Sequence, residues 1–114
     1  MPQIIQYGGV LLRYNPQKSV IEYSRDGGRC WATRYPGTSA GVFYDLLPVG
    51  SIILAATSKG IYYSRDEGRS WAARYTGSTP GTFQSLAMDG TNILATTSKG
   101  LFYSRDEGRS WVRR

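Results

Sequence analysis

A nine-residue phrase occurs three times in this chain, and successive copies lie forty residues apart. The copies are YSRDGGRCW at Tyr23–Trp31, YSRDEGRSW at Tyr63–Trp71 and YSRDEGRSW at Tyr103–Trp111. A repeat period of about 20 to 50 residues indicates that one supersecondary unit is stacked several times along the chain. This repeat therefore constrains the fold more strongly than any other feature of the sequence.

Each repeat contains four short runs of β-branched and aromatic residues, separated by turns rich in Gly, Pro, Ser and Asp, which is typical of strands. In the second repeat the runs are Phe43–Leu47, Ile52–Thr57, Ile61–Ser64 and Trp71–Tyr75. No stretch shows a helical period of useful length. We therefore expect an all-β chain that forms a single domain over residues 1–114, with three four-stranded repeats at about 2–41, 42–81 and 82–114.

The first repeat begins less regularly than the others, and we assign its first two strands to Gln3–Gln6 and Val10–Tyr14. Side chains alternate in the third run of each repeat, which is a strand period. One face would carry the apolar residues Ile21 and Tyr23, Ile61 and Tyr63, and Leu101 and Tyr103. The residues between them, Glu22, Tyr62 and Phe102, vary in polarity, which predicts a face turned to solvent or to a neighbouring unit.

The phrase contains the pattern Ser-x-Asp-x-Gly-x-x-Trp, preceded by Gly60-Ile-Tyr-Tyr in the second repeat and by Gly100-Leu-Phe-Tyr in the third. This spelling resembles the Asp-box, or bacterial neuraminidase (BNR), repeat, which occurs in the β-propellers of sialidases, xyloglucan-degrading glucanases, sortilin-type receptors and photosystem assembly factors. The resemblance implies a hairpin turn between the third and fourth strands of each blade. The box residues are Ser24, Asp26, Gly28, Trp31, Ser64, Asp66, Gly68, Trp71, Ser104, Asp106, Gly108 and Trp111.

The residue types of the box suit a structural role. An Asp side chain can accept hydrogen bonds from turn N–H groups, a Gly can take a positive φ, and a Trp can pack between neighbouring units. We therefore expect no catalytic function for the box carboxylates. Cys30 is the single cysteine, so it forms no internal disulfide. Because it takes the place of a Ser in the first box, we expect it to be a small, partly buried thiol.

Three blades are too few to close a propeller ring, since such rings usually contain about four to eight blades. We expect two chains to complete a six-bladed ring as a homodimer around the ring axis. The alternative is a monomeric β-trefoil, which is also built from three units of about forty residues. No apolar run reaches the length of a membrane span, and no signal peptide is apparent, so the sequence favours a cytoplasmic protein and leaves secretion open.

The sequence offers little for catalysis or metal binding. It contains no His, which removes imidazole bases and most zinc sites, and one Cys makes no thiolate cluster. No constellation of the sialidase type stands out, and we expect no cofactor and no metal. The expected function is a non-enzymatic binding module, with a fragment or relative of a sialidase-like, polysaccharide-active enzyme and a protein-contact scaffold as alternatives.

The net charge of +6, from 14 Lys and Arg against 8 Asp and Glu, favours an anionic ligand such as an acidic glycan. Nucleic acid is allowed by the charge, although no motif supports it. In propellers the ligand usually lies at the end opposite the box turns, where we place the candidate ligand-binding residues Lys18, Lys59, Lys99, Tyr35 and Tyr75. The box-end arginines are expected to pair with the box carboxylates.

Overall fold

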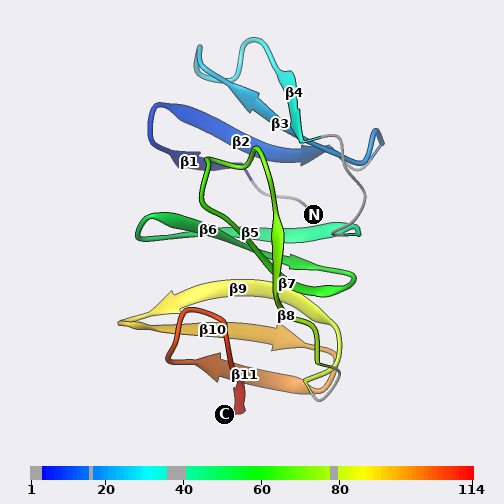
Figure 1. Ribbon diagram of the computed structural model, residues 1–114, viewed down its shortest axis with the longest axis vertical. Helices are drawn as coiled ribbons and strands as arrows, with labels where there is room; N and C mark the ends of the chain where they lie inside the picture. The colour runs from blue at the N-terminus through cyan, green and yellow to red at the C-terminus, as the bar shows by residue number, and fades with distance from the viewer. Residues whose placement is uncertain (1–3, 16, 36–40, 78–79) are drawn as a thin grey trace.

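The computed structural model of the protein describes residues 4–15, 17–35, 41–77 and 80–114. These residues form twelve strands (Figure 1). The strands are β1 (Ile5–Tyr7), β2 (Val10–Asn15), β3 (Val20–Ser24), β4 (Ala32–Tyr35), β5 (Phe43–Val49), β6 (Ile52–Thr57), β7 (Gly60–Ser64), β8 (Ala72–Tyr75), β9 (Phe83–Asp89), β10 (Asn92–Thr97), β11 (Gly100–Ser104) and β12 (Val112–Arg113). Within the described ranges there is no helix that is long and apolar enough to cross a membrane.

The strands form three separate four-stranded sheets, ordered β1-β2-β3-β4, β5-β6-β7-β8 and β9-β10-β11-β12, and every neighbouring pair is antiparallel. The expected all-β fold with four strands per repeat is therefore confirmed. Three independent meanders are blades of a propeller rather than a β-trefoil, so the trefoil alternative is wrong. The first strand is described at Ile5–Tyr7, which overlaps the predicted Gln3–Gln6, and Gln3 itself lies outside the described residues.

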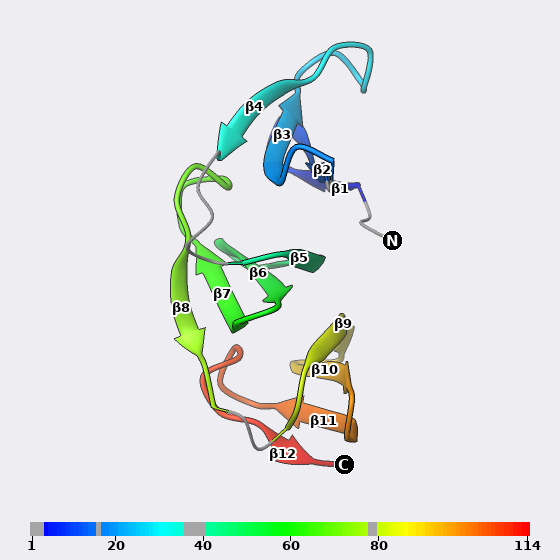
Figure 2. The same cartoon turned by 90° about the vertical axis from the view of Figure 1, so that its right-hand side faces the viewer.

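The three sheets are stacked along an arc (Figure 2). The first strands β1, β5 and β9 run along one side of the stack, and the fourth strands β4, β8 and β12 run along the other. A hydrogen bond links the first strands of the second and third sheets: Asp45 Oδ2 in β5 accepts the Leu86 N–H of β9 at 2.8 Å. The arrangement is a partial propeller of three blades.

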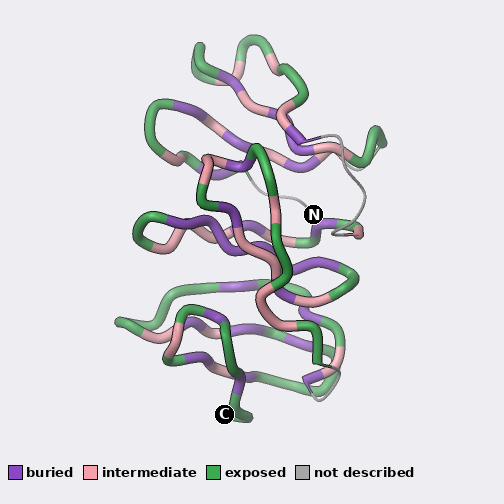
Figure 3. The backbone as a smooth tube through the Cα atoms, viewed as in Figure 1, coloured by how far each residue is buried: buried purple, intermediate pink, exposed green. Residues whose placement is uncertain are grey.

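Two apolar layers hold the stack together, one between each pair of neighbouring sheets (Figure 3). The first contains Leu12 and Ile21 of the first sheet with Phe43 and Ile53 of the second. The second layer repeats this arrangement one sheet further along. Strand β6 is buried along its whole length because both faces of the middle sheet are covered. Burial of apolar surface, at about 25 cal/mol per Å², is thus the main force that stacks the sheets.

The predicted alternation in the third strands is confirmed, and Tyr62 and Phe102 take the second of the two settings expected for this column, a face turned to a neighbouring unit. Phe102 is only 4% exposed because this column faces the preceding sheet. Glu22 is 5% exposed although no sheet precedes its own, because Arg13 and Asn15 bind its carboxylate. Conversely, Leu101 is 42% exposed, whereas its equivalents Ile21 and Ile61 are fully buried, because no described sheet follows the third one.

Candidate functional site

A four-stranded meander places its turns alternately at two ends of the sheet. We call the end that carries the β3–β4, β7–β8 and β11–β12 turns the box end. The opposite end, which carries the β2–β3, β6–β7 and β10–β11 turns and the connectors between sheets, is the loop end. The two ends are chemically different.

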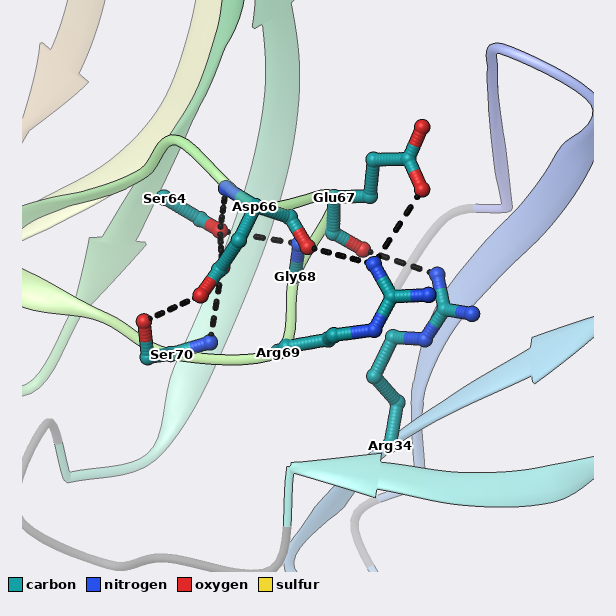
Figure 4. Close-up of polar contacts among 7 residues, drawn as sticks. All are labelled: Arg34, Ser64, Asp66, Glu67, Gly68, Arg69 and Ser70. Carbon is teal, nitrogen blue, oxygen red and sulfur yellow. Dashed lines mark hydrogen bonds and ion pairs between the residues drawn. The ribbon is translucent and has the colours of Figure 1, made fainter.

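The box of the second repeat is a closed network of hydrogen bonds (Figure 4). The Ser64 hydroxyl donates to Asp66 Oδ1 at 2.8 Å and accepts the Gly68 N–H at 2.8 Å. Asp66 Oδ1 also accepts the Ser70 N–H at 2.9 Å, and Trp71 Nε1 donates to the Gly68 carbonyl at 3.1 Å. Each polar group of the box thus fixes the turn, as expected of an Asx-type arrangement.

The first and third boxes repeat these bonds. Ser24 donates to Asp26 and Ser104 donates to Asp106, each at 2.8 Å. The predicted positive φ is present at Gly28, Gly68 and Gly108, with values of 96°, 92° and 94°. The expected partial burial of Cys30 is wrong, since the residue is exposed. The reason is that the Ser slot lies on the outer side of the turn, where Ser70 and Ser110 are also exposed.

The residue that precedes the box glycine also has a left-handed backbone conformation, which we did not predict from the sequence. Glu67 and Glu107 also have positive φ values, of 64° and 63°. Gly27 takes this place in the first box with a φ of 78°. The glycine substitution in one of three otherwise similar boxes was the sequence signal for this left-handed position, because glycine adopts it without steric cost.

The box carboxylates have lowered pKa values. Partial burial alone would raise the pKa of Asp106, but hydrogen bonds from the Ser110 hydroxyl and N–H and from the Ser104 hydroxyl outweigh it and lower the pKa to about 2. Asp66 is shifted downwards by the equivalent contacts, against the same effect of burial. The hydrogen bond from the Cys30 N–H is the main cause of the lowered pKa of Asp26. The charged form is therefore the one that the fold requires.

These shifts predict acid-sensitive stability. A carboxylate whose pKa is lower in the folded than in the unfolded chain stabilises the fold above the unfolded value of about 3.9, and this contribution is lost as pH falls through the folded value. We expect the free energy of unfolding, measured by urea titration, to fall between about pH 5 and pH 2. The Asp66→Asn, Asp106→Asn variant should be less stable at pH 7 and lose less over this range. An equal loss in wild type and variant would contradict this role of the boxes.

The arginines of the box end are engaged with their surroundings. Arg65 and Arg105 each lie 5.3 Å above the ring of the tyrosine two residues earlier, and Arg69 pairs with Glu67 at 3.2 Å. Arg109 lies 3.7 Å from Glu107 in the same way. The box end therefore mixes cations and anions, whereas a site for an anion needs unopposed positive charge.

At the loop end, a repeated Thr-Ser-Lys-Gly turn is held rigidly. Ser58 exchanges hydrogen bonds with Val42, as its hydroxyl accepts the Val42 N–H and its own N–H donates to the Val42 carbonyl, both at 2.9 Å. The Thr57 hydroxyl donates to the Gly60 carbonyl at 3.1 Å. Ser98 and Thr97 make the same bonds in the third sheet. These contacts fix the backbone on both sides of each lysine.

Lys18, Lys59 and Lys99 are all exposed at the loop end. None of the ion pairs among the described residues involves these three side chains. Two carboxylates on the strands are already engaged elsewhere, since Glu22 pairs with Arg13 at 2.9 Å and Asp45 accepts backbone N–H groups. Lysines from three adjacent blades thus give this end a net positive charge.

A pocket of about 270 Å³ opens beside Lys59, between the β6–β7 turn and the connector that leads to β9. Polar and apolar surface contribute about equally to its lining, which includes four Ser and Thr residues and Lys59. The lining residues are Thr57, Ser58, Lys59, Gly60, Thr76, Gly77, Gly81, Thr82 and Phe83. The hydroxyls of Thr76 and Thr82 were not among the residues expected from the sequence, because the connector carries no recognisable motif.

The two candidate tyrosines pack inwards. Tyr35 is 9% exposed, and its ring meets Phe43 edge-on at 6.2 Å. Tyr75 meets Phe83 edge-on at 6.0 Å and is partly buried in the second apolar layer. The structure therefore brings the lysines to one surface but uses these aromatic rings mainly for packing. Within the described residues, no group of three or more His, Cys, Asp or Glu is arranged to hold a metal ion.

The model of the BNR/Asp-box repeat matches residues 62–73, which contain the second box with the adjoining parts of β7 and β8. The same bonds close the boxes of the first and third sheets. The protein carries Asp-box repeats. No curated protein matches the chain.

Solved structures share the arrangement of these Asp-box sheets. An ancestral GH74 enzyme aligns over 96% of this chain with a TM-score of 0.72 at 17% identity, and YCF48 bound to D1 peptide aligns over 96% with a TM-score of 0.70 at 18% identity. The computationally designed Ika4 protein aligns over 89% with a TM-score of 0.60 at 9% identity. This chain spans only 17%, 38% and 62% of those three chains, so the likeness shows the propeller fold alone.

Proposed function

We propose that the protein is a non-enzymatic binding module that recognises an acidic glycan at its loop end. The observation that carries this proposal is the pocket beside Lys59, in which hydroxyl groups and backbone lie next to an ammonium group without an ion-pair partner among the described residues. A carboxylate or sulfate on a sugar suits the ammonium, and the sugar hydroxyls suit the Ser and Thr side chains. Lys99 adds a further cation at the same end.

Two observations favour a glycan over nucleic acid. Single-stranded nucleic acid is usually bound by aromatic rings on which the bases stack. Tyr35 and Tyr75, the tyrosines among the candidate ligand-binding residues, are packed against Phe43 and Phe83. The pocket is instead lined by hydroxyl groups, which match the hydrogen-bonding capacity of a sugar ring.

The carboxylates give further support to binding without catalysis. A glycosidase needs two carboxyl groups that face each other across a cleft. The box carboxylates fix their own turns, Glu22 pairs with Arg13, and Asp89 pairs with Arg114. A GH74 enzyme is among the similar structures, and a fragment or relative of a polysaccharide-active enzyme is the alternative that activity on a fluorogenic glycoside would favour.

Peptide binding is the second candidate function. It is favoured by the similarity to YCF48, whose structure was solved with the D1 peptide bound. A peptide with acidic side chains would be attracted by the same three lysines. The glycan remains the first choice because four of the nine residues that line the pocket carry a hydroxyl group.

The proposal predicts a charge-dependent affinity. We expect the protein to bind sulfated, uronic-acid or sialic-acid glycans on an array and to ignore neutral ones. The Lys59→Glu, Lys99→Glu variant should bind the best of these glycans about ten- to a hundredfold more weakly by calorimetry, since a hydrogen bond to a charged group contributes about 1.5–3 kcal/mol. Higher salt should weaken the wild type.

The matched control is Arg65→Glu, Arg105→Glu, which changes the net charge equally but at the box end. Its affinity should stay within about threefold of wild type, as expected for screened charges far from a site. Equal losses in the two double variants, or equal binding of neutral glycans, would argue against a site at the loop end.

A further inference from the structure

The contacts between neighbouring sheets follow a repeated pattern. Arg34 of the first sheet lies 4.0 Å above the Tyr23 ring and donates its Nη1 to the Glu67 carbonyl of the second box at 3.1 Å (Figure 4). Arg74 repeats this arrangement, over Tyr63 at 4.1 Å and to the Glu107 carbonyl of the third box at 2.9 Å. We call this contact the arginine clamp.

A leucine accompanies each clamp. A Cβ atom added to Gly68 would lie 3.4 Å from the side chain of Leu12, and one added to Gly108 would lie 3.4 Å from that of Leu54. The box glycine therefore provides the surface on which the leucine of the preceding sheet packs. Every interface within the chain thus has a donor half, made of Leu, Tyr and Arg, and an acceptor half, made of the turn of the next box.

The third sheet repeats the donor half without an acceptor. Its equivalent residues are Leu94, Tyr103 and Arg114, since Arg114 follows Trp111 as Arg34 follows Trp31 and Arg74 follows Trp71. Leu101 is 42% exposed and Val112 is 53% exposed on the same face, because Val112 pairs with Tyr103 across the strands. Arg114 donates to Asp89 at 2.9 Å instead, and both side chains remain about half exposed.

The first sheet carries an acceptor half without a donor. Gly27 has the left-handed conformation of Glu67 and Glu107, which turns the backbone in the same way as in the clamped boxes. A Cβ atom added to Gly28 would meet only Trp31 and Leu11 of its own sheet. Ile4 is 55% exposed on this face, whereas its equivalents Leu46 and Leu86 are 2% and 7% exposed.

This acceptor face differs from the others by a polar pair. Arg13 and Glu22 replace Ala55 and Tyr62 of the second sheet, and they form an ion pair at 2.9 Å. Arg13 lies 4.0 Å above the Trp31 ring, and the Asn15 amide also donates to Glu22. The pair is satisfied within its own sheet, so covering it leaves no buried charge unpaired. The two interfaces within the chain have no ion pair at this place, so the pair distinguishes the open face of the first sheet from them.

We propose that a second copy of the chain covers each exposed face, with Arg114 of one copy clamping the Gly27 carbonyl of the other. The donor and acceptor halves lie on opposite faces of one molecule, so the contact runs head to tail and closes only through rotation about a ring axis. Two chains then form a ring of six sheets, within the usual size range of propellers. The proposed interface between chains repeats the contacts of the two sheet–sheet interfaces within the chain. The proposal does not depend on the pocket at the loop end.

Sedimentation velocity at micromolar concentration tests the proposal. The wild type should have about twice the mass of the 12.7 kDa chain. Leu101→Asp should be a folded monomer, because the side chain is already exposed in the single chain. Arg114→Ala should raise the dimer dissociation constant about tenfold or more. Met88→Asp is the control, since Met88 is 44% exposed on the other face of the third sheet and should leave the dimer unchanged.

Thermal unfolding gives a second readout. The wild-type midpoint should rise with protein concentration, whereas that of Leu101→Asp should not. A monomeric wild type would overturn the proposal and leave the face to a sheet of another protein. An assembly larger than two chains, or a dimer insensitive to Leu101→Asp, would overturn it as well.

Discussion

Trp111→Ala is expected to lower the free energy of unfolding by about 3–5 kcal/mol, the usual loss for a large buried aromatic side chain. Trp111 is 9% exposed, its ring lies 5.1 Å from that of Phe83, and its Nε1 donates to the Gly108 carbonyl at 3.0 Å. The substitution leaves a cavity between the second and third sheets and removes the bond that holds the box turn. Urea titration followed by circular dichroism measures the change.

Trp31→Ala is the matched control for this prediction. Trp31 keeps the same bond to its box glycine, but its ring lies on the open face under the Arg13 guanidinium rather than between two sheets. We expect Trp31→Ala to lower the free energy of unfolding by less than half as much as Trp111→Ala does. Both are to be measured in the Leu101→Asp background, which we expect to be monomeric. Equal losses in the two variants would mean that packing between sheets is not what makes the box tryptophan important.

Gly60→Ala is expected to be the most damaging glycine substitution among the described residues. Gly60 has a φ of 130°, and an added Cβ atom would collide with the Tyr75 carbonyl oxygen of the neighbouring strand. The backbone conformation alone costs about 1–3 kcal/mol for a residue with a side chain. The collision adds to this cost, because a carbonyl in a strand cannot move without breaking its ladder.

Gly100→Ala separates these two effects. Gly100 occupies the same place in the third repeat with a φ of 123°, but the nearest atom to an added Cβ would be Arg113 Nη2 at 3.8 Å. It should therefore show the conformational cost alone, and the melting temperature of Gly60→Ala should fall clearly further. Equal melting temperatures for the two variants would contradict the steric argument.

The box could be interpreted from sequence because its bonds are local. Ser64, Asp66 and Gly68 lie within five residues of one another, so their types and spacing specify the turn almost independently of the rest of the fold. The three-sheet architecture was predictable for a related reason, since each repeat is one local meander. Local hydrogen bonding of this kind is what a repeated motif records.

The contacts between sheets were less accessible to sequence reasoning. Arg34 and the Glu67 carbonyl are 33 residues apart, and nothing in the sequence says that a backbone oxygen is the acceptor. The recurrence of an arginine three residues after each box tryptophan was the available signal. Tyr35 and Tyr75 were expected near a ligand because they adjoin the connectors, but the pleat of the strand turns both rings into the apolar layers.

The polar pair of the first sheet depends on tertiary context in another way. Arg13 and Glu22 are nine residues apart and belong to the repeat that aligns least well with the others. Their registry across β2 and β3 brings them together, since Arg13 is the direct partner of Glu22. A buried glutamate can only be expected once this pairing is known, because burying an unpaired charge costs much free energy.

We propose that the boxes hold the fold and that the loop end binds the ligand. The most direct measurement is a nuclear magnetic resonance titration of the isotopically labelled protein with a sulfated or uronic-acid oligosaccharide. We expect the largest amide shifts at Thr57–Gly60, Thr76–Gly77 and Gly81–Phe83, with small shifts in the box turns. Shifts concentrated at Arg65–Ser70 and Arg105–Ser110 would place the ligand at the box end and contradict the account.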